Sequence, residues 1–172
     1  IIRITEPYKE ALRKFHPSGT VITLANGTVI GGDNLTLMAG TCTTEDYQKT
    51  LEAAYWAKEA GAQVQRGGAL KPRTGPYSFQ GHGEKGLEIL ARVKQETGLP
   101  IVTEILIPED ENMPLKQLID MFERYGVDIY QVGARSAQNF GLLHALSKRK
   151  HPVLYKNGLG MTAEEFLQGA EY

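Results

Sequence analysis

Short apolar runs alternate with amphipathic stretches from about residue 35 to the end of the chain. The apolar runs indicate strands, and the stretches between them repeat apolar residues at the spacing of one helix face. We expect five strands, at residues 35–40, 62–68, 100–106, 128–134 and 152–158. Strands that alternate with helices are typical of a parallel sheet, because each connection crosses back over a face of the sheet.

The remaining stretches predict five helices, within residues 44–61, 83–98, 114–126, 136–150 and 162–172. Thr43, Thr44 and Thr162 stand where a side chain caps the start of a helix. Glycine is common where a helix stops, because it adopts the left-handed conformation that ends the last turn. Such glycines close three of the predicted helices, at Gly61, Gly98 and Gly126.

A β-hairpin precedes the first of these units. The segment TVITLANGTVIGG, residues 20–32, has Asn26-Gly27 between two β-rich runs, which predicts a two-residue turn. We expect residues 1–34 to form a lead-in and hairpin cap, and residues 35–172 to form strands 1 to 5 of an α/β fold of the (β/α)8 TIM-barrel type. A closed barrel has eight strands and about 250 residues, so this chain predicts an incomplete barrel.

Composition excludes several classes of protein. The formal net charge is -1, which does not favour a nucleic-acid or membrane-surface partner, and no apolar run is long enough for a membrane span. The single cysteine, Cys42, allows no internal disulfide and favours a cytoplasmic protein. The chain begins with Ile1 and not with Met, so we expect it to be trimmed or processed, or to have a further beginning before Ile1.

Five cations follow or end the predicted strands. In parallel βα folds, ligands bind at the carboxyl ends of the strands, where these side chains should meet. Such a cluster in a chain of nearly neutral charge indicates a small anionic ligand that carries phosphate, carboxylate or both. The five are Arg66, Lys71, Arg73, Arg135 and Lys156.

Each residue also has a plainer interpretation. A single strand-end arginine such as Arg135 can be a structural ion-pair partner, and a single cysteine such as Cys42 is usually a small buried apolar residue. Glu104 could be a catalytic acid or the counterion that neutralises a nearby Lys or Arg, and we favour the counterion. Lys156 lies in an apolar run, where it must be placed and paired, so it is a functional candidate. The residues alone indicate an enzyme acting on a phosphorylated molecule, but a Schiff-base aldolase stays equally open.

The segment that carries Arg66, Lys71 and Arg73 resembles the sequence of a known family. The segment RGGALKPRTGPYSFQGHGEKGLEIL, residues 66–90, is similar to the signature of 3-deoxy-D-arabino-heptulosonate 7-phosphate (DAHP) synthase of the microbial type I beta subgroup. The resemblance continues through AGTCTTED, GLPIVTE, QVGARSAQNF, PVLYKNG and TAEEFLQGAEY in the family's order. The family joins phosphoenolpyruvate to erythrose 4-phosphate and releases phosphate, the first step towards the aromatic amino acids.

The resemblance implies a role for each matching residue. Arg66, Lys71, Arg135 and Lys156 would hold phosphoenolpyruvate, with Lys71 and Lys156 as the catalytic residues. The tetrad Lys71-Pro72-Arg73-Thr74 would line the erythrose 4-phosphate side and distinguishes the family from the synthase that uses arabinose 5-phosphate. Cys42 would be a thiolate ligand of a divalent metal ion, Mn²⁺ or a similar ion, that polarises the aldehyde. A homo-oligomer, dimer or tetramer, is also implied.

The chain departs from the family pattern at several positions. Thr41 replaces a proline beside Cys42, which puts metal binding in doubt, and Gly75, Ser136 and Asn157 replace an expected Ser, Asn and Arg. The family's other metal ligands come from later strands, so we expect little or no turnover from this chain alone. Three hypotheses remain: part of a full DAHP synthase, which we favour; a shortened non-catalytic relative that binds phosphorylated ligands or regulates a partner; and a chain completed by another subunit.

Overall fold

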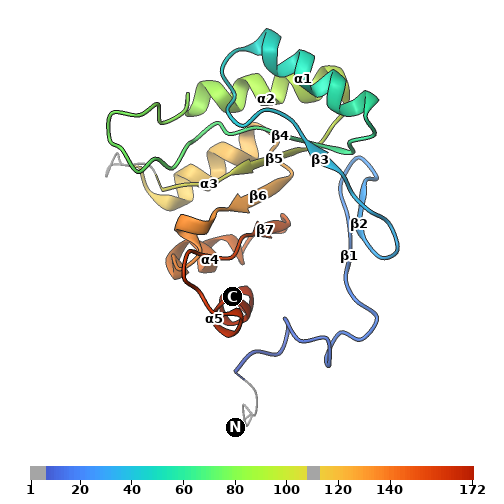
Figure 1. Cartoon of the computed structure of the whole chain (residues 1–172), viewed down its shortest axis with the longest axis vertical. Helices are drawn as coiled ribbons and strands as arrows, with labels where there is room; N and C mark the ends of the chain where they lie inside the picture. Colours follow the sequence, from blue (N-terminus) through green and yellow to red (C-terminus); the bar gives the residue numbers. More distant parts are fainter. Residues whose placement is uncertain (1–6, 108–112) are drawn as a thin grey trace.

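A computed structural model describes residues 7–107 and 113–172 of the chain. Its main sheet has five parallel strands in the order β3-β4-β5-β6-β7, and β1 and β2 form a separate antiparallel hairpin (Figure 1). The strands are β1 (Val21–Thr23), β2 (Val29–Gly31), β3 (Met38–Ala39), β4 (Val64–Arg66), β5 (Ile101–Glu104), β6 (Ile129–Val132) and β7 (Val153–Tyr155). The helices are α1 (Tyr47–Glu59), α2 (Glu84–Thr97), α3 (Leu115–Arg124), α4 (Phe140–Leu146) and α5 (Ala163–Ala170), with a 3-10 turn, η1 (Ala134–Ser136).

All five predicted strands exist, in the predicted order, and each is shorter than expected. The paired register is brief: Arg66 lies opposite Val102, and Val132 lies opposite Tyr155. Beyond these pairs the chain leaves the ladder and runs into the loops at the carboxyl end. The apolar runs therefore predicted the strands well and their ends less well, because apolar residues outside the ladder also help to fill the core.

The structure confirms the three helix ends predicted from glycine, but one predicted N-cap is wrong. Gly61, Gly98 and Gly126 all have positive φ angles at or just after a helix end. Thr162 caps α5 with a full capping box, as expected. The prediction of a threonine N-cap for α1 is wrong, however. The N-cap is Asp46, whose side chain accepts a hydrogen bond from Lys49 N at 2.8 Å. Thr44 is buried, and its backbone N–H donates to Gly68 O instead.

The predicted bounds of the fourth helix, residues 136–150, are also wrong. The segment from residue 136 begins with the last residue of η1, and α4 starts only at Phe140. Asn139 is the N-cap, because its side chain accepts from Leu142 N at 3.0 Å. The helix ends at Leu146, well before the predicted limit at residue 150. The polar stretch after it, residues 147–150, forms turns.

The hairpin has a three-residue connection in place of the predicted two-residue turn. Leu24 N donates to Thr28 O, and Gly27 N donates to Leu24 O. Within the connection of residues 25–27 only Gly27 has a positive φ angle, so Asn26 does not adopt the conformation that a two-residue type I′ turn needs. The lead-in forms only turns over residues 7–19, and the first six residues of the predicted cap lie outside the described residues.

The hairpin covers one face of the sheet, at the amino ends of the strands. Leu24 packs with Val64, Val102 and Ile129 there, and all four are at most 6% exposed. The alternate strand residues face the helices, where Ile101, Tyr130 and Val132 join Leu87, Leu90, Leu118, Phe122 and Leu142 in the main core. In Figure 1 the hairpin stands to the right of the sheet, away from the loop of residues 67–83 on the left.

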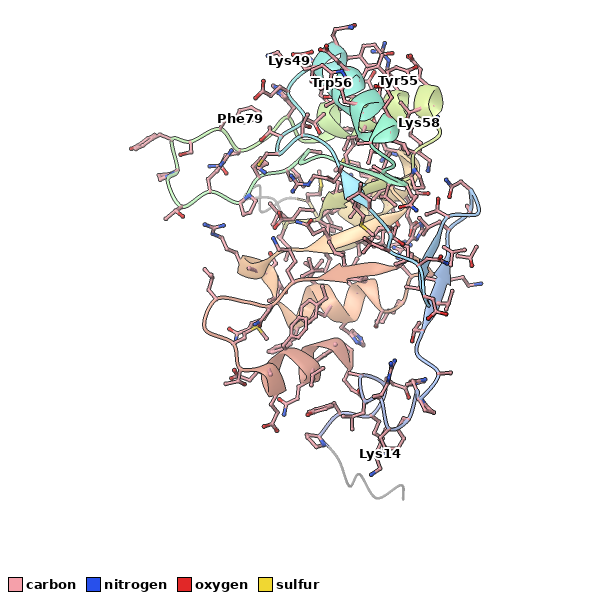
Figure 2. All side chains as sticks on the ribbon, turned by 45° about the vertical axis from the view of Figure 1, so that its right-hand side comes forward. Lys14, Lys49, Tyr55, Trp56, Lys58 and Phe79 are labelled. Carbon is pink, nitrogen blue, oxygen red and sulfur yellow. The ribbon has the colours of Figure 1, made fainter. Side chains whose placement is uncertain are left out.

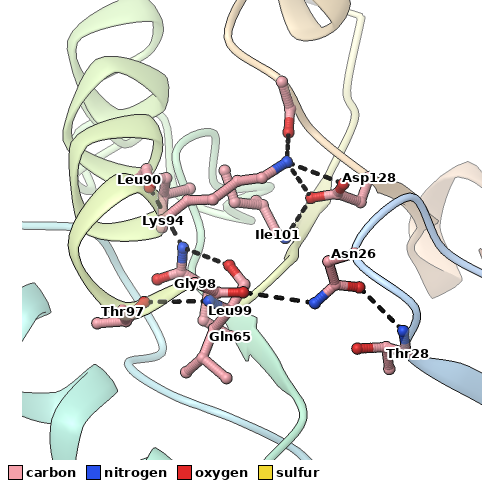
Figure 3. A network of polar contacts seen from close by, with 11 residues as sticks. Asn26, Thr28, Gln65, Leu90, Lys94, Thr97, Gly98, Leu99, Ile101 and Asp128 are labelled. Carbon is pink, nitrogen blue, oxygen red and sulfur yellow. Dashed lines mark hydrogen bonds and ion pairs between the residues drawn. The ribbon is translucent and has the colours of Figure 1, made fainter.

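A polar network ties the amino ends of the strands to the helices (Figure 3). Lys94 donates to both carboxylate oxygens of Asp128, at 2.8 and 2.7 Å, and Asp128 accepts from Ile101 N. Asn26 reaches from the hairpin to Gly98 O at 3.4 Å. These contacts lie at the end of the sheet opposite the cationic loops.

Replacing Leu24 by alanine should lower the free energy of unfolding by about 2–4 kcal/mol, because it removes a buried side chain from the contact between the hairpin and the sheet. Urea unfolding followed by circular dichroism measures the change. Leu35→Ala is the matched control, since Leu35 is 90% exposed and should give a change close to zero. Equal losses in the two variants would contradict the packing of the hairpin on the sheet.

Candidate active site

The cationic loop between β4 and α2 folds back on itself at the carboxyl end of the sheet. Leu70 and Gly81 form an isolated antiparallel bridge, and Lys71 N donates to Gln80 O at 2.9 Å. Its tip carries exposed aromatic side chains, with Phe79 labelled in Figure 2. The base of the loop is therefore fixed close to the end of β4, and its tip extends into solvent.

Lys71, Arg66 and Cys42 form one group at this end. The Lys71 ammonium donates to Cys42 O at 2.8 Å and to Cys42 Sγ at 3.4 Å. The Arg66 guanidinium donates to Thr41 O at 3.2 Å. Two cations that lie far apart in sequence from Cys42 thus converge on the loop after β3, as the strand-end argument predicted.

Glycine makes this convergence possible. A Cβ atom on Gly68 would lie 2.7 Å from Cys42 O and 2.7 Å from the Cδ atom of Lys71. On the other side, a Cβ atom on Gly40 would lie 2.2 Å from Arg66 O, and Gly40 has a positive φ angle. Any larger residue at either position would push the loop after β3 away from β4.

The two cations change the chemistry of the thiol. Hydrogen bonding and charge from Lys71, followed by smaller effects of Arg66, hold the pKa of Cys42 below its ordinary value, although some burial acts in the opposite direction. Cys42 is a free and exposed cysteine. The interpretation of a single cysteine as a buried apolar residue is therefore wrong, and its thiol is suited to act as a thiolate.

The rest of the tetrad lies beside a hollow and a second arginine. Arg135, after β6, donates to Thr74 Oγ1 at 3.3 Å, which links the loop after β6 to the loop after β4. Arg73 Nε donates to Phe79 O within its own loop. A hollow of about 400 Å³ opens next to this loop. Its lining includes Lys71, Pro72 and Arg73 with Leu70, Gln80, Gly81, Gly83, Leu106 and Ile107.

Two expectations from the sequence need correction. Lys156 was expected to be placed and paired, but it is exposed, and its side chain has no hydrogen bond or salt bridge among the described residues. It follows β7, whose Val153 and Leu154 are themselves 39% and 37% exposed, so the apolar run did not signal burial here. Glu104 was expected to neutralise a cation, yet it accepts a hydrogen bond from Gln131 Nε2 at 3.2 Å.

Sequence reasoning missed Gln131 and Thr44 as supports of the site. Gln131 lies on the same sheet face as Glu104, opposite it in the register, and holds its carboxylate. Thr44 fixes the end of the loop after β3 through its bond to Gly68 O. Alternation along β6 could have identified Gln131 as facing the inner surface, whereas nothing local marks Thr44.

The metal-ligating residues within residues 7–107 and 113–172 do not gather. No group of three or more histidine, cysteine, aspartate or glutamate side chains could hold a metal ion in that part of the chain. Cys42, with its lowered pKa, fits a single thiolate ligand. The described residues therefore do not form a complete metal site by themselves.

Comparison with known proteins decides the family. The model of the DAHP synthetase I family matches residues 19–172. The chain belongs to this family. A phospho-2-dehydro-3-deoxyheptonate aldolase of Thermotoga maritima is 45% identical over all 172 residues, which make up 48% of that protein. A 2-dehydro-3-deoxyphosphooctonate aldolase of Desulfatibacillum aliphaticivorans is 32% identical over 143 residues, or 78% of this chain and 49% of that protein.

Solved structures agree with the fold. The crystal structure of DAHP synthase from Thermotoga maritima superposes with a TM-score of 0.83 at 44% identity, covering 99% of this chain and 47% of that one. A truncated form of the synthase from the same organism gives 0.75 at 42% identity over 92% of this chain and 54% of that one. The five-stranded sheet with its helices is therefore part of a TIM barrel, and the chain spans about half the length of these relatives.

Replacing Lys71 by methionine should raise the pKa of Cys42, because the substitution removes the cation that contributes most to lowering it. Only the thiolate reacts quickly with iodoacetamide, so the pH midpoint of alkylation should move upward and the rate at neutral pH should fall. Mass spectrometry can follow the reaction cleanly, since Cys42 is the only cysteine. Lys148→Met, at an exposed lysine after α4, should leave the profile unchanged; an unchanged profile in Lys71→Met would refute the contact.

Proposed function

We propose that the chain supplies part of the active site of a DAHP synthase, which condenses phosphoenolpyruvate with erythrose 4-phosphate and releases phosphate. The convergence of Lys71 and Arg66 on Cys42 at the carboxyl end of a parallel sheet carries this proposal. It is the geometry expected for binding an anionic substrate, and it occurs in a chain of the matching family. Identity to an aldolase over the whole chain favours an enzyme over a non-catalytic relative.

Counting carbon atoms supports the choice of aldehyde. The relative of 45% identity is named for a seven-carbon heptonate, and the relatives of 34% identity and below are named for an eight-carbon octonate. Phosphoenolpyruvate contributes three carbons, so a seven-carbon product needs a four-carbon aldehyde such as erythrose 4-phosphate. The tetrad from Lys71 to Thr74 points to the same aldehyde.

The cations would divide between the two substrates. Arg66 and Lys71, with Arg135 and Lys156, would hold the phosphate and carboxylate of phosphoenolpyruvate. Forked guanidinium groups suit both groups, and an ammonium neutralises a concentrated negative charge. Lys71 and Lys156 would act as the catalytic residues by stabilising charge that develops as the bonds change.

The second substrate would lie along the tetrad. Lys71, Pro72, Arg73 and Thr74 would line its binding side, next to the hollow that the first three of them help to form. Thr74 is bonded to Arg135. We infer that this contact joins the two substrate regions and holds the exposed loop in a position that receives both.

The family is generally metal-dependent, and a divalent ion such as Mn²⁺ would polarise the aldehyde carbonyl as a Lewis acid. Cys42 would be one thiolate ligand, and the described residues contain no group of three or more ligands that could hold the ion. We therefore assign no step to the metal.

We also propose a cytoplasmic location, because the one cysteine is a free thiol, and a homo-oligomeric assembly.

Arg66→Ala should weaken the binding of phosphoenolpyruvate by about 10- to 100-fold, because it removes charge-assisted hydrogen bonds to the ligand. Isothermal titration calorimetry of the purified protein measures the change. Arg124→Ala is the matched control, since Arg124 lies on α3 and pairs with Glu84 on the outside of the sheet. Unchanged affinity in Arg66→Ala would contradict the assignment of the loop.

A second titration tests the aldehyde. With phosphoenolpyruvate saturating and no metal added, erythrose 4-phosphate should bind more tightly than arabinose 5-phosphate, and Arg73→Ala should remove the difference. The preference would come from the tetrad, where the shorter aldehyde phosphate fits. Tighter binding of arabinose 5-phosphate would overturn the choice of substrate while leaving the phosphoenolpyruvate site intact.

A further inference from the structure

Glu104 is a carboxylate at the edge of the sheet where the proposed substrate cations gather. It lies opposite Gln131 in the register of β5 and β6. Val102 and Ile129, two residues earlier on each strand, pack against the hairpin, so Glu104 and Gln131 face the same inner side of the sheet, beyond this apolar layer. Among the described residues Glu104 forms no salt bridge. A negative charge in this place weakens the binding of an anion unless its position is controlled.

The Lys71 ammonium lies on the chain segment beside Glu104. Ala69 N donates to Thr103 Oγ1 at 3.5 Å, so the segment that contains Gly68 runs next to the end of β5. A Cβ atom on Gly68 would lie 3.1 Å from Lys71 Nζ, which places the ammonium over this segment. Adjacent strands are about 4.8 Å apart, so rotation of the Glu104 side chain would bring its carboxylate to Lys71.

Two contacts turn the Glu104 carboxylate in the opposite direction, towards β6. Gln131 Nε2 donates to Glu104 Oε2 at 3.2 Å. The other oxygen, Oε1, occupies the space that a Cβ atom on Gly133 would take, and the three atoms nearest to that position all belong to Glu104. In the sheet, β6 and β4 lie on opposite sides of β5. The carboxylate is therefore held on the side away from the segment that carries Lys71.

We propose that Gln131 and Gly133 are positioning residues that prevent an ion pair between Glu104 and Lys71. The inference rests on the proposed function, because Lys71 is one of the cations that would bind phosphoenolpyruvate. Gln131 suits this role, since its amide holds the carboxylate through a hydrogen bond and adds no charge of its own. Gly133 suits it because any side chain would fill the space in which the carboxylate lies.

An ion pair between Glu104 and Lys71 would compete directly with the substrate. Glu104 belongs to the same chain, so its carboxylate stands near Lys71 at a high effective concentration, whereas a ligand arrives from solution. The apparent affinity for the ligand falls in proportion to the fraction of molecules in which the cation is free. A pair that forms in about nine of ten molecules would weaken binding about tenfold. Holding Glu104 against β6 therefore keeps the cation open to an anionic ligand.

Gly133→Ala tests the space beside β6. Gly133 has a φ angle of -74° and a ψ angle of 168°, which alanine adopts readily, so the substitution displaces the flexible end of Glu104 and not the backbone. The binding of phosphoenolpyruvate, measured by isothermal titration calorimetry, should weaken about tenfold. Gly141→Ala, on α4, is the matched control and should leave the affinity unchanged, because its Cβ atom would make only an ordinary contact with Asn139, at 3.6 Å.

Gln131→Met tests the hydrogen bond, since methionine has a similar length without the amide and suits a residue that is 8% exposed. This variant should also bind phosphoenolpyruvate about tenfold more weakly. In a Glu104→Gln background, neither Gln131→Met nor Gly133→Ala should change the affinity by more than about twofold, because a neutral amide cannot form the ion pair. An equal loss in both backgrounds would show a general disturbance of the strand and overturn the proposal. No loss in either variant of a parent that binds phosphoenolpyruvate would overturn it too.

A crystal structure of the Gly133→Ala variant without ligand separates this inference from the proposed function. The displaced Glu104 carboxylate should lie within about 4 Å of Lys71 Nζ, the distance of a salt bridge. A carboxylate that turns to any other position would refute the inference, whether or not the parent protein binds phosphoenolpyruvate. A parent that binds no phosphoenolpyruvate, together with a variant that shows the ion pair, would contradict the proposed function alone.

Discussion

The approach of two backbones at Gly68 is the constraint on which the site depends. With a side chain at this position, a Cβ atom would lie 2.7 Å from Cys42 O, so the loop after β3 could not pack against the end of β4. That packing brings Lys71 within 2.8 Å of Cys42 O, and the contact with Lys71 lowers the pKa of the Cys42 thiol. Thr44 N secures the same junction by donating to Gly68 O. The backbone therefore positions Lys71 and Arg66 against the loop after β3.

The two ends of the sheet differ in the kind of contact that their residues make. At the amino end, Leu24 of the hairpin covers Val64, Val102 and Ile129, and Lys94 pairs with Asp128. At the carboxyl end, by contrast, most of the charged side chains contact backbone carbonyls, a hydroxyl or no group in the described part of the chain. Cations that are not neutralised by carboxylates remain available to an anionic ligand.

Sequence alone predicted what depends on local pattern. The alternation of apolar runs and amphipathic stretches gave five strands in the correct order, and glycine marked three helix ends. The polar residues at strand ends pointed to the correct edge of the sheet, since parallel strands share one carboxyl edge. The resemblance in residues 66–90 then indicated the family that the comparisons support.

What sequence could not predict depends on contacts between distant residues. In the sequence Thr44 resembles a helix N-cap. In the structure its backbone N–H donates a hydrogen bond to Gly68 O, and Asp46 caps α1. Lys156 follows the apolar run VLY and was expected to be placed and paired, but among the described residues β7 pairs with β6 alone, and Lys156 is exposed. The lowered pKa of Cys42 needs Lys71, 29 residues away. No local pattern encodes such distances.

A crystal structure of the protein with phosphoenolpyruvate would test the central claim most directly. The account predicts that the ligand lies at the carboxyl end of the sheet, with its phosphate and carboxylate within hydrogen-bond distance of Arg66, Lys71, Arg135 and Lys156. The loop of residues 67–83 would keep its contact with the loop after β3. A ligand bound elsewhere, or at this edge without contact to Arg66 and Lys71, would contradict the account.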